Sequence, residues 1–599
     1  MQLSRIVVKG FRSLGFVDVP VVALASCVIG ENNTGKSNLI QALRLCLDVN
    51  LPSSYRALLK EDVHCAIDQS KPFQVLIGVE FKGFEGDDNA VATLYNARTL
   101  GDHARIFYRF RPKRQVREAL ETGERASDSL TIEDYGWELS GGGDPSKDLA
   151  DIEWNHDNDS FGATSVGLQY LQSYLVVYLH ALRDVETDLQ QPRRSPLARL
   201  IEASNIDQAE RQTLINAIKT ANDQIEKTPT IKSIAQAVDS AFKEVTGPAF
   251  SLDVDLGLSA PTFEAIIRSI NILMSGNAMK NFDPRRNGLG LNNILYISIL
   301  IEYFRKRAAA GKAAGELILI EEPEAHLHPQ LQLTLLEALR ALPFQSIVTT
   351  HSTQVTSKAP MDAFVLLTNT GAAAPHASTI SQIPSLTPND VSDLERYLDA
   401  TKSNLLFARK VMLVEGPAEV FLIPPMVKSI MGIDLDREGI SVVAIHGVHF
   451  GPFTKLFNEH GLPKRCAIVA DADFVPADAD IADDDEDDVD EPAKPDITAL
   501  EGTYVKAFLG KTTFEREITL DGNEKMLEKA CREVGAPKIA SKLELAGILG
   551  VDEALKKSVL NTAKRFGKAR FAQTAAKHAG DAGKLPDYIE KAVEWLMET

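Results

Sequence analysis

The strongest constraint on the fold is the octapeptide GENNTGKS at residues 30–37, which matches the pattern G-x-x-x-x-G-K-[ST]. The apolar residues 21–29 predict a buried strand before it, and residues 38–43 continue it as a helix. In this setting the pattern binds a nucleoside triphosphate, because backbone N–H groups and the helix N-terminus face the phosphates. We expect Lys36 to reach the β/γ oxygens and Ser37 to hold Mg²⁺. The predicted nucleotide-binding residues are Gly30, Asn32, Asn33, Thr34, Gly35, Lys36, Ser37 and Asn38.

The length and composition indicate a multidomain globular protein. A chain of 599 residues is expected to hold several domains. No apolar run reaches the length of a membrane span, and the N-terminus lacks a signal-peptide layout, so we expect no membrane association. The five cysteines show no paired spacing, which argues against a zinc site or a disulfide framework. A reducing, cytoplasmic setting is the simplest expectation.

The formal net charge of −19 argues superficially against a nucleic-acid partner. Part of this charge is local, however, because residues 483–491 concentrate acids in one run that is typical of a solvated loop. Basic stretches remain at residues 105–114 and 564–571. Either stretch could contact phosphates, although a solvated face is the simpler interpretation of each alone.

The first half of the chain predicts a strand-rich domain interrupted by helices. Strands are expected at residues 3–9, 73–81, 105–110 and 170–180, with the second and third paired, and residues 122–162 are expected to be loops. The segment 205–246 is expected to be helical, with the apolar spacing of an amphipathic helix. This insertion could serve self-association or pack within its own domain. Strands are expected to resume at residues 250–256 and 263–274.

Acidic and histidine residues follow two later strands in the pattern of a phosphoryl-transfer site. Residues 317–322 form an apolar strand that ends in Glu321 and Glu322. Glu321 would hold Mg²⁺ through water and Glu322 would polarise the attacking water. The strand at residues 346–350 is followed by His351, which could sense the γ-phosphate.

Together these features resemble the ABC-type ATPase heads of chromosome-maintenance and break-repair proteins. The resemblance rests on the phosphate loop, Gly288-Leu289-Gly290 before a helix, the acidic strand and His351, in that order. It implies that two heads sandwich ATP, with Gly288 and Gly290 of one head facing the loop of the other. Glu321 replaces the usual aspartate, and the serine-glycine-glycine form is missing, so fast ATP turnover is left open. No long heptad region is present, which argues against a coiled-coil arm.

The second half of the chain predicts a carboxylate metal centre. The strand at residues 410–414 is followed by Glu415 and Glu419, and the strand at 466–470 by Asp471 and Asp473. Because parallel strands end at one edge of a sheet, these carboxylates would converge. Their mutual repulsion favours divalent cations, and oxygen ligands favour Mg²⁺ or Mn²⁺. Two ions there could support phosphodiester cleavage. Glu515 could add a ligand or be an ordinary exposed helix acid.

The motifs V-E-G-x-x-E and D-x-D resemble the Toprim domain of topoisomerases, primases and certain nucleases. An ABC-type head fused to a Toprim domain resembles the overcoming-lysogenization-defect (OLD) nucleases, and this resemblance covers nearly the whole chain. It implies that a lysine from the C-terminal helices enters the metal centre. Lys568 is the residue that we expect, stabilising charge on the scissile phosphate, although a generic basic residue is the alternative.

The expected fold class is α/β: an ABC-type ATPase with mixed sheets and a helical insertion, then a Rossmann-like Toprim domain and a helical C-terminal region. The expected domains are an ATPase N-lobe at 1–190, an insertion at 191–248, an ATPase C-lobe at 249–370, a linker at 371–392, a Toprim domain at 393–522 and C-terminal helices at 523–599.

The sequence therefore predicts a homodimeric or higher even-numbered DNA endonuclease that uses Mg²⁺ or Mn²⁺, two ions in the Toprim centre and one with ATP. A non-cleaving ATP-gated DNA clamp is the alternative, and a topoisomerase or primase is the second. No segment resembles a strand-passage domain with a nucleophilic tyrosine, or a primase zinc module. The resemblance suggests phage defence or DNA repair, with a helicase or another defence protein as a partner, and the residues do not choose between these roles.

Overall fold

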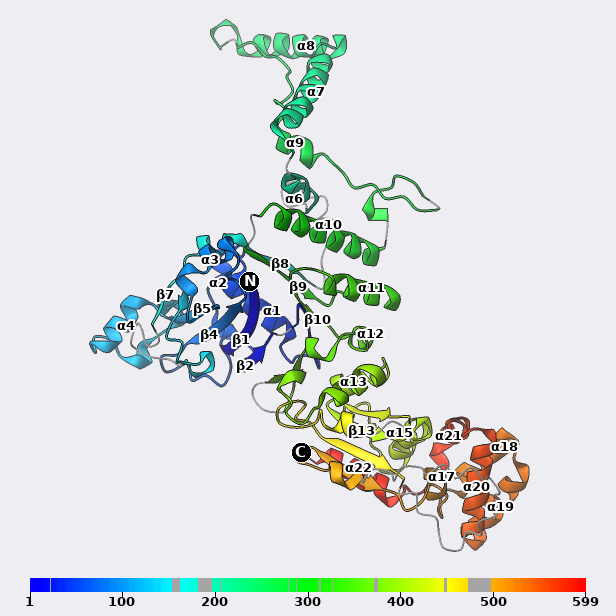
Figure 1. Ribbon diagram of the computed structural model, residues 1–599. Helices are drawn as coiled ribbons and strands as arrows, with labels where there is room; N and C mark the ends of the chain where they lie inside the picture. Colours follow the sequence, from blue (N-terminus) through cyan, green and yellow to red (C-terminus); the bar gives the residue numbers. More distant parts are fainter. Residues whose placement is uncertain are drawn as a thin grey trace. The chain divides into compact units, whose positions relative to one another are not determined.

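In the computed structural model the chain forms two compact units (Figure 1). One unit contains residues 1–179, 317–324 and 329–599, and the other contains residues 180–316 and 325–328. The structure describes residues 1–598 apart from residues 22, 153–161, 181–195, 205, 251, 278, 287, 312–313, 326, 371–374, 447–449 and 472–496. The acidic run at 483–491 therefore lies outside the described residues. The boundaries given above for the separate domains stay predictions.

The first sheet of the larger unit is antiparallel, with the strand order β2-β1-β4-β5-β6-β7. Its strands are β1 Gln2–Phe11, β2 Leu14–Pro20, β4 Val75–Lys82, β5 His103–Pro112, β6 Tyr135–Gly142 and β7 Ala163–Ser165. The predicted pairing of β4 with β5 is confirmed. The expectation of loops over 122–162 is wrong, because β6 lies there. A Cβ at Gly141 would lie 3.0 Å from the Cα of Ala97, so the glycine that suggested a loop serves close packing.

The basic stretch at residues 105–114 lies largely within β5 and is neither a phosphate patch nor a solvated face. The Nε of Arg105 lies 2.8 Å from Glu80, and Arg111 forms an ion pair with Glu138. The Nε of Arg109 donates to Gln74 at 2.6 Å, and the Arg109 and Arg111 side chains are buried. These arginines therefore bind the polar side chains of neighbouring strands in the sheet.

The second sheet carries the phosphate loop and has the order β12-β11-β3-β10-β9-β8. Its strands are β3 Ala25–Gly30, β8 Tyr174–Leu179, β9 Gly315–Glu321, β10 Gln345–Thr349, β11 Phe364–Thr368 and β12 His376–Thr379. β3 lies parallel to β10 and β11, so the three strands end at the same edge. β12 pairs with β11, so part of the segment expected to be a linker belongs to this sheet.

The third sheet is wholly parallel, with the order β14-β13-β15-β16. Its strands are β13 Lys410–Val414, β14 Ile440–Ala444, β15 Cys466–Ala470 and β16 Val505–Leu509. The helices around and after it are α15 Pro417–Met431, α16 Phe450–Thr454, α17 Phe514–Glu517, α18 Glu524–Val534, α19 Pro537–Leu549, α20 Glu553–Phe566, α21 Lys568–Ala576 and α22 Asp587–Met597. This arrangement confirms the predicted Rossmann-like sheet and the helical C-terminal region.

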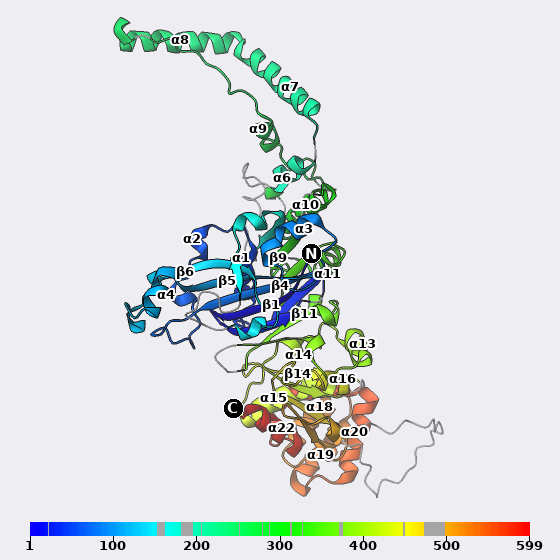
Figure 2. The ribbon, with the colours of Figure 1, turned by 60° about the vertical axis from the view of Figure 1, so that its left-hand side comes forward.

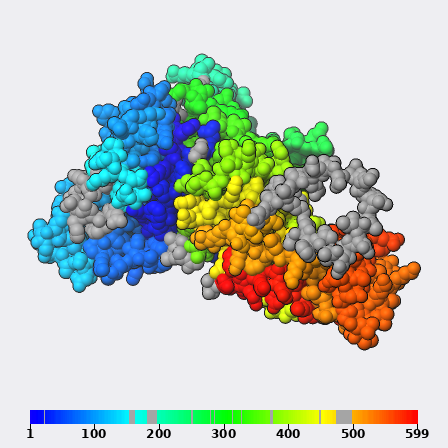
Figure 3. Space-filling view, turned by 60° about the horizontal axis from the view of Figure 1, so that its bottom comes forward, coloured from blue at the N-terminus to red at the C-terminus, as the bar shows by residue number. Residues whose placement is uncertain are grey.

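One hydrophobic core joins the second and third sheets. It includes Ile29 of β3 and Leu366 of β11 together with Leu413 of β13 and Ile468 of β15. Two helices, α13 Pro388–Tyr397 and α14 Asn404–Phe407, precede the third sheet in the chain. α14 contacts both β3 and β14, and Figure 2 shows it between β11 and β14. In Figure 3 the yellow and lime residues of this unit lie directly against its dark blue N-terminal residues.

The second unit is helical and contains the predicted insertion. Its helices are α6 Pro196–Ala203, α7 Gln208–Glu226, α8 Pro229–Thr246, α9 Phe263–Arg268 and α10 Leu289–Ala309. The helices expected over 205–246 are confirmed as α7 and α8. The strands expected at 250–256 and 263–274 are wrong: α9 forms instead, because Thr262 caps it and Phe263 and Ile267 are buried at a helical spacing. None of the helices among the described residues is long and apolar enough to cross a membrane.

Candidate functional site

The phosphate loop connects β3 to α1 Lys36–Leu47. Glycine is required at both of its ends. A Cβ at Gly30 would lie 2.1 Å from the carbonyl oxygen of Leu367, and Gly35 has a φ of 94°. No side chain caps the N-terminus of α1. The N–H groups of its first turn are therefore available to an anion, which fits a nucleotide phosphate.

Lys36 is 6% exposed and turns back onto the loop. Its Nζ donates to the carbonyl oxygens of Gly30 at 3.0 Å and Glu31 at 2.6 Å. Burial lowers the pKa of Lys36 to about 8, while Glu322 and Glu31 raise it. A bound phosphate would favour the charged form of this lysine and compensate for its burial.

Other predicted nucleotide-binding residues hold the shape of the loop. Thr34 donates its hydroxyl to the carbonyl of Glu31 at 2.9 Å, and the side-chain amide of Asn38 donates to Ser13 at 2.8 Å. Asn33 has a positive φ of 64°. The side chains of Asn32, Asn33 and Ser37 are exposed, as groups that meet a ligand would be.

The acidic strand β9 ends at the same edge as the phosphate loop, because β10 lies parallel to both β3 and β9. Glu321 accepts a hydrogen bond from the hydroxyl of Tyr178 at 3.0 Å. The Oε1 of Glu322 lies 3.6 Å from the Nε2 of His351, and Glu322 adopts a positive φ of 43°. Glu322 also acts on the pKa of Lys36. The structure therefore brings Lys36, Glu322 and His351 together where β3, β9 and β10 end.

Glu324 is a residue that sequence reasoning missed. One of its oxygens accepts from the Thr350 hydroxyl at 2.7 Å and the His351 N–H at 2.8 Å. The other oxygen is buried without a hydrogen-bond partner, and burial raises the pKa of Glu324. Its position in Glu-Glu-Pro-Glu was the available signal. It fixes the backbone before His351.

Gly288 and Gly290 lie in the second unit, at the start of α10. Gly288 is the N-cap residue, without a side chain to cap the helix, and Gly290 is buried in the first turn. Their expected role toward the loop of a second copy stays a prediction.

The carboxyl edge of the third sheet gathers the predicted metal ligands. Glu415 directly follows β13, Glu419 lies in the first turn of α15, and Asp471 directly follows β15. The backbone N–H of Asp471 donates to the Oε1 of Glu415 at 2.7 Å. The Oδ2 of Asp471 accepts from the N–H of Phe514 at 3.1 Å. Asp473 lies outside the described residues.

Burial and the charges of neighbouring acids both raise the pKa values of these carboxylates. Burial, followed by the charge of Glu415, raises the pKa of Asp471 to about 8. Burial, with Glu515 and Glu415, raises the pKa of Glu419 to about 7. Such shifts mark a cluster with too little positive charge around it, which is the condition that a divalent cation relieves.

Glu515 and Lys568 belong to the same cluster. Glu515 lies on α17 and is 2% exposed, so the alternative of an ordinary exposed acid is wrong. Lys568 begins α21, and its Nζ lies 3.1 Å from the Oε2 of Glu515. Burial alone would lower the pKa of Lys568, but Glu515 and Asp471 raise it above its ordinary value.

The oxygen donors fit a divalent cation in chemistry but are not yet arranged around one. Within the described part of the chain, no group of three or more His, Cys, Asp or Glu residues could hold a metal ion as it stands. Glu415 and Asp471 instead accept backbone N–H groups.

Tyr588, on α22, is a second residue that the sequence did not reveal. Its side chain is buried, and burial followed by the charges of Asp471 and Glu419 raises its pKa well above the ordinary value. A Cβ at Gly510 would lie 3.2 Å from the Tyr588 ring. The glycine after β16 thus leaves room for a phenol beside the carboxylates.

Comparison with known proteins finds relatives for both halves of the chain. Residues 1–356 match the family model described as AAA ATPase domain, and residues 406–473 match that described as overcoming lysogenization defect protein-like, TOPRIM domain. Endonuclease GajA of Bacillus cereus (strain VD045) is 23% identical, over 77% of this chain and 74% of its own. The Old nuclease of Escherichia phage P2 is 24% identical, over 79% and 78%. The OLD nuclease of Thermus scotoductus (strain ATCC 700910 / SA-01) is 22% identical, over 74% and 77%. The chain therefore belongs to the AAA ATPase domain family, and it joins this domain to a segment that matches the OLD-like Toprim model.

Proposed function

We propose that this protein is an ATP-dependent, metal-dependent DNA endonuclease. The observation that carries the proposal is the cluster of Glu415, Glu419 and Asp471 beside the Lys568–Glu515 pair. Oxygen ligands next to a single lysine suit a phosphodiester and its metal ions better than they suit a structural site. Three relatives named above carry the name nuclease or endonuclease, which supports the same class.

Each residue of the cluster has a proposed role. Glu415, Glu419, Asp471, Asp473 and Glu515 would hold Mg²⁺ or Mn²⁺, with two ions in this centre. Such ions activate a water and stabilise a leaving oxygen. The amine of Lys568, already directed at Glu515, would stabilise the charge on the scissile phosphate.

The ATPase half would control access to this centre. Gly30, Gly35 and the first turn of α1 would bind the phosphates, with Lys36 at the β/γ oxygens and Ser37 at Mg²⁺. Glu321 would hold the same ion through water. Glu322 would orient the attacking water, and His351 would bind the γ-phosphate. The shared core between β3 and β13 offers a physical route by which nucleotide binding affects the Toprim sheet.

Plasmid cleavage tests the proposal. We expect the purified full-length chain to nick or cut plasmid DNA with Mg²⁺ or Mn²⁺, and Asp471→Asn to lower the rate by at least about a hundredfold. Glu594→Gln, at an exposed acid on α22, is the matched control and should cut normally. If the protein retains DNA without cutting it, or if Asp471→Asn cuts like the wild type, the endonuclease proposal fails and a DNA clamp is favoured.

A further inference from the structure

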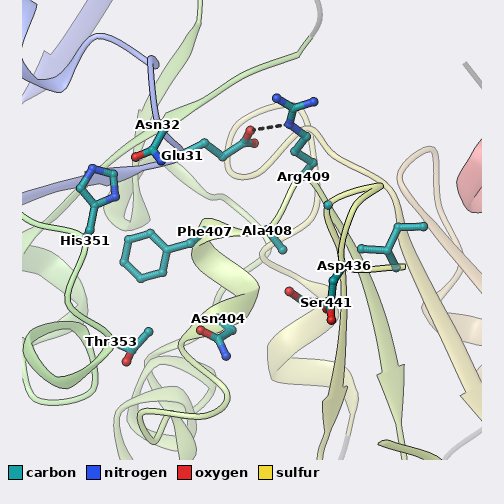
Figure 4. A pocket seen from close by; sticks show the side chains of 12 residues that line it. Glu31, Asn32, His351, Thr353, Asn404, Phe407, Ala408, Arg409, Asp436 and Ser441 are labelled. Atoms are coloured by element: carbon teal, nitrogen blue, oxygen red, sulfur yellow. Dashed lines mark ion pairs between the residues drawn. The ribbon is translucent and has the colours of Figure 1, made fainter. Parts of the chain in front are cut away.

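A pocket of about 420 Å³ lies between the phosphate loop and the Toprim sheet (Figure 4). Glu31 and Asn32 of the loop line it together with His351. Phe407, Arg409 and Asp436 line it from the Toprim side. All of these residues belong to the larger compact unit, whose core is continuous across the two sheets. The pocket is therefore a feature within one folded body.

Glu31 is poorly satisfied in this pocket. Its side chain is 8% exposed, and its Oε1 is buried without a hydrogen-bond partner. Its Oε2 lies 3.4 Å from the Nε of Arg409, which is one long contact in place of the bidentate pair that arginine and carboxylate usually form. The Arg409 side chain is 70% exposed. An ion pair with such an exposed partner contributes little, so Arg409 can leave it at low cost.

The other two cations that act on Glu31 are already held by backbone carbonyls. Lys464 is buried, and its Nζ donates to Leu406 at 3.1 Å and Ala408 at 2.6 Å. The Nζ of Lys36 donates to Gly30 and Glu31. Among the described cations that shift the pKa of Glu31, Arg409 is thus the one with an exposed side chain and the freedom to move.

The pocket adjoins the phosphate loop, because Glu31 and Asn32 of this loop line it. Lys36, which reaches the β/γ oxygens in loops of this pattern, contacts Glu31 at the pocket wall. His351 lines the pocket and lies beside Glu322. His351, which is expected to bind the terminal phosphate, therefore lines the same pocket as Arg409.

We propose that Arg409 leaves Glu31 on nucleotide binding and binds the terminal phosphate of ATP, so that the Toprim domain contributes a residue that distinguishes ATP from ADP. This inference rests on the ATP site of the proposed function. A guanidinium suits a phosphate because it is always charged and donates two parallel hydrogen bonds. Arg409 immediately precedes β13, and Glu415 immediately follows this strand. The contact would therefore tie the terminal phosphate to the strand that carries a metal ligand.

Equilibrium binding of nucleotides to the full-length protein tests this inference. With Mg²⁺ present, Arg409→Ala should weaken the binding of a non-hydrolysable ATP analogue by about tenfold or more and leave ADP binding within about twofold. Arg409→Lys should bind the ATP analogue with an affinity between those of the wild type and Arg409→Ala, since lysine keeps the charge without the planar guanidinium. Arg437→Ala is the matched control: its side chain is 87% exposed near Asp434, and neither affinity should change.

A second variant should change the affinity for the ATP analogue in the opposite direction. Glu31→Gln removes the carboxylate that competes for Arg409, so it should strengthen binding of the ATP analogue by about two- to fivefold without strengthening ADP binding. An unchanged ATP-analogue affinity in Arg409→Ala, or an equal loss for both nucleotides, overturns the inference. If Lys36→Ala leaves binding intact, or the wild type binds neither nucleotide, the proposed ATP site itself fails, which is a different result.

Discussion

The Nζ of Lys568 lies 3.1 Å from the Oε2 of Glu515, so a lysine at the start of α21 meets a carboxylate on α17. The amine also senses Asp471 and Glu419, which raise its pKa. This contact places one positive charge among several buried acids, as a site for a charged phosphate needs.

Replacing Lys568 tests whether this charge serves cleavage. We expect Lys568→Ala to lower the rate of plasmid cleavage by about 10²–10³-fold, since an electrostatic contact to a developing charge is lost. The melting temperature should fall, because the buried Glu515 loses its cationic partner, so cleavage is measured at a temperature at which both proteins are folded. Lys542→Ala, at an exposed lysine on α19, should cleave normally. Equal rates in the two variants would contradict the role of Lys568.

Replacing Tyr588 tests whether the protein hydrolyses DNA or cleaves it through a tyrosine, as a topoisomerase does. A tyrosine phenol is protonated near neutral pH and is then a poor nucleophile, and burial beside Asp471 raises the pKa of Tyr588 further. Tyr588→Phe should therefore keep cleavage within about threefold of the wild type, and denaturing gels should show no DNA attached to the protein. A covalent adduct of DNA with the wild-type protein that is absent in Tyr588→Phe would favour a topoisomerase-like reaction instead.

Local patterns predicted much of the fold and of both sites. Gly35 and Lys36 were predictable because a strand, a glycine turn and a helix are contiguous in sequence. Glu415 and Asp471 were predictable because each directly follows a strand of one parallel sheet. Their convergence follows from topology alone.

Other features depend on contacts between distant segments. Glu31 and Arg409 meet because one core joins β3 to β13, and nothing near either residue indicates that core. Gly141 suggested a loop but packs against Ala97 within a sheet. A strand was expected at residues 263–274, yet the Thr262 cap and the burial of Ile267 favour the helix α9. In each case tertiary packing overrode a local preference.

The buried Lys464 predicts a pH dependence of stability. Burial lowers its pKa from 10.5 to about 8, while Glu31 and Cys466 raise it. Between these values the folded chain loses a proton that the unfolded chain keeps, so stability from this group rises with pH. The melting temperature of the wild type relative to Lys464→Met should therefore increase from about pH 8 toward pH 10. Lys428→Met, at an exposed lysine, should show no such trend. If the difference in melting temperature between the wild type and Lys464→Met stays constant across this pH range, the prediction is contradicted.

The exposed apolar side chains of α7 indicate a surface through which two copies assemble. α7 has no buried residue, and Leu214, Ile218 and Ile225 are exposed along it. An amphipathic helix of this kind is stabilised mainly by packing its apolar face, and a second copy would supply that packing. We therefore expect the wild type to be a dimer by light scattering.

Replacing both Leu214 and Ile218 with glutamate should weaken this dimer by about thirtyfold or more, because two charges would enter an apolar contact. Gln212 and Asn216 are joined by a hydrogen bond on the exposed surface of α7. The matched control replaces these two residues with glutamate, and this variant should remain a dimer. Cleavage should fall with dimer dissociation if two heads must close around ATP. A dimer that survives the apolar substitutions at low micromolar concentration would place the interface elsewhere, and a monomeric wild type that cleaves DNA would contradict the requirement for two copies.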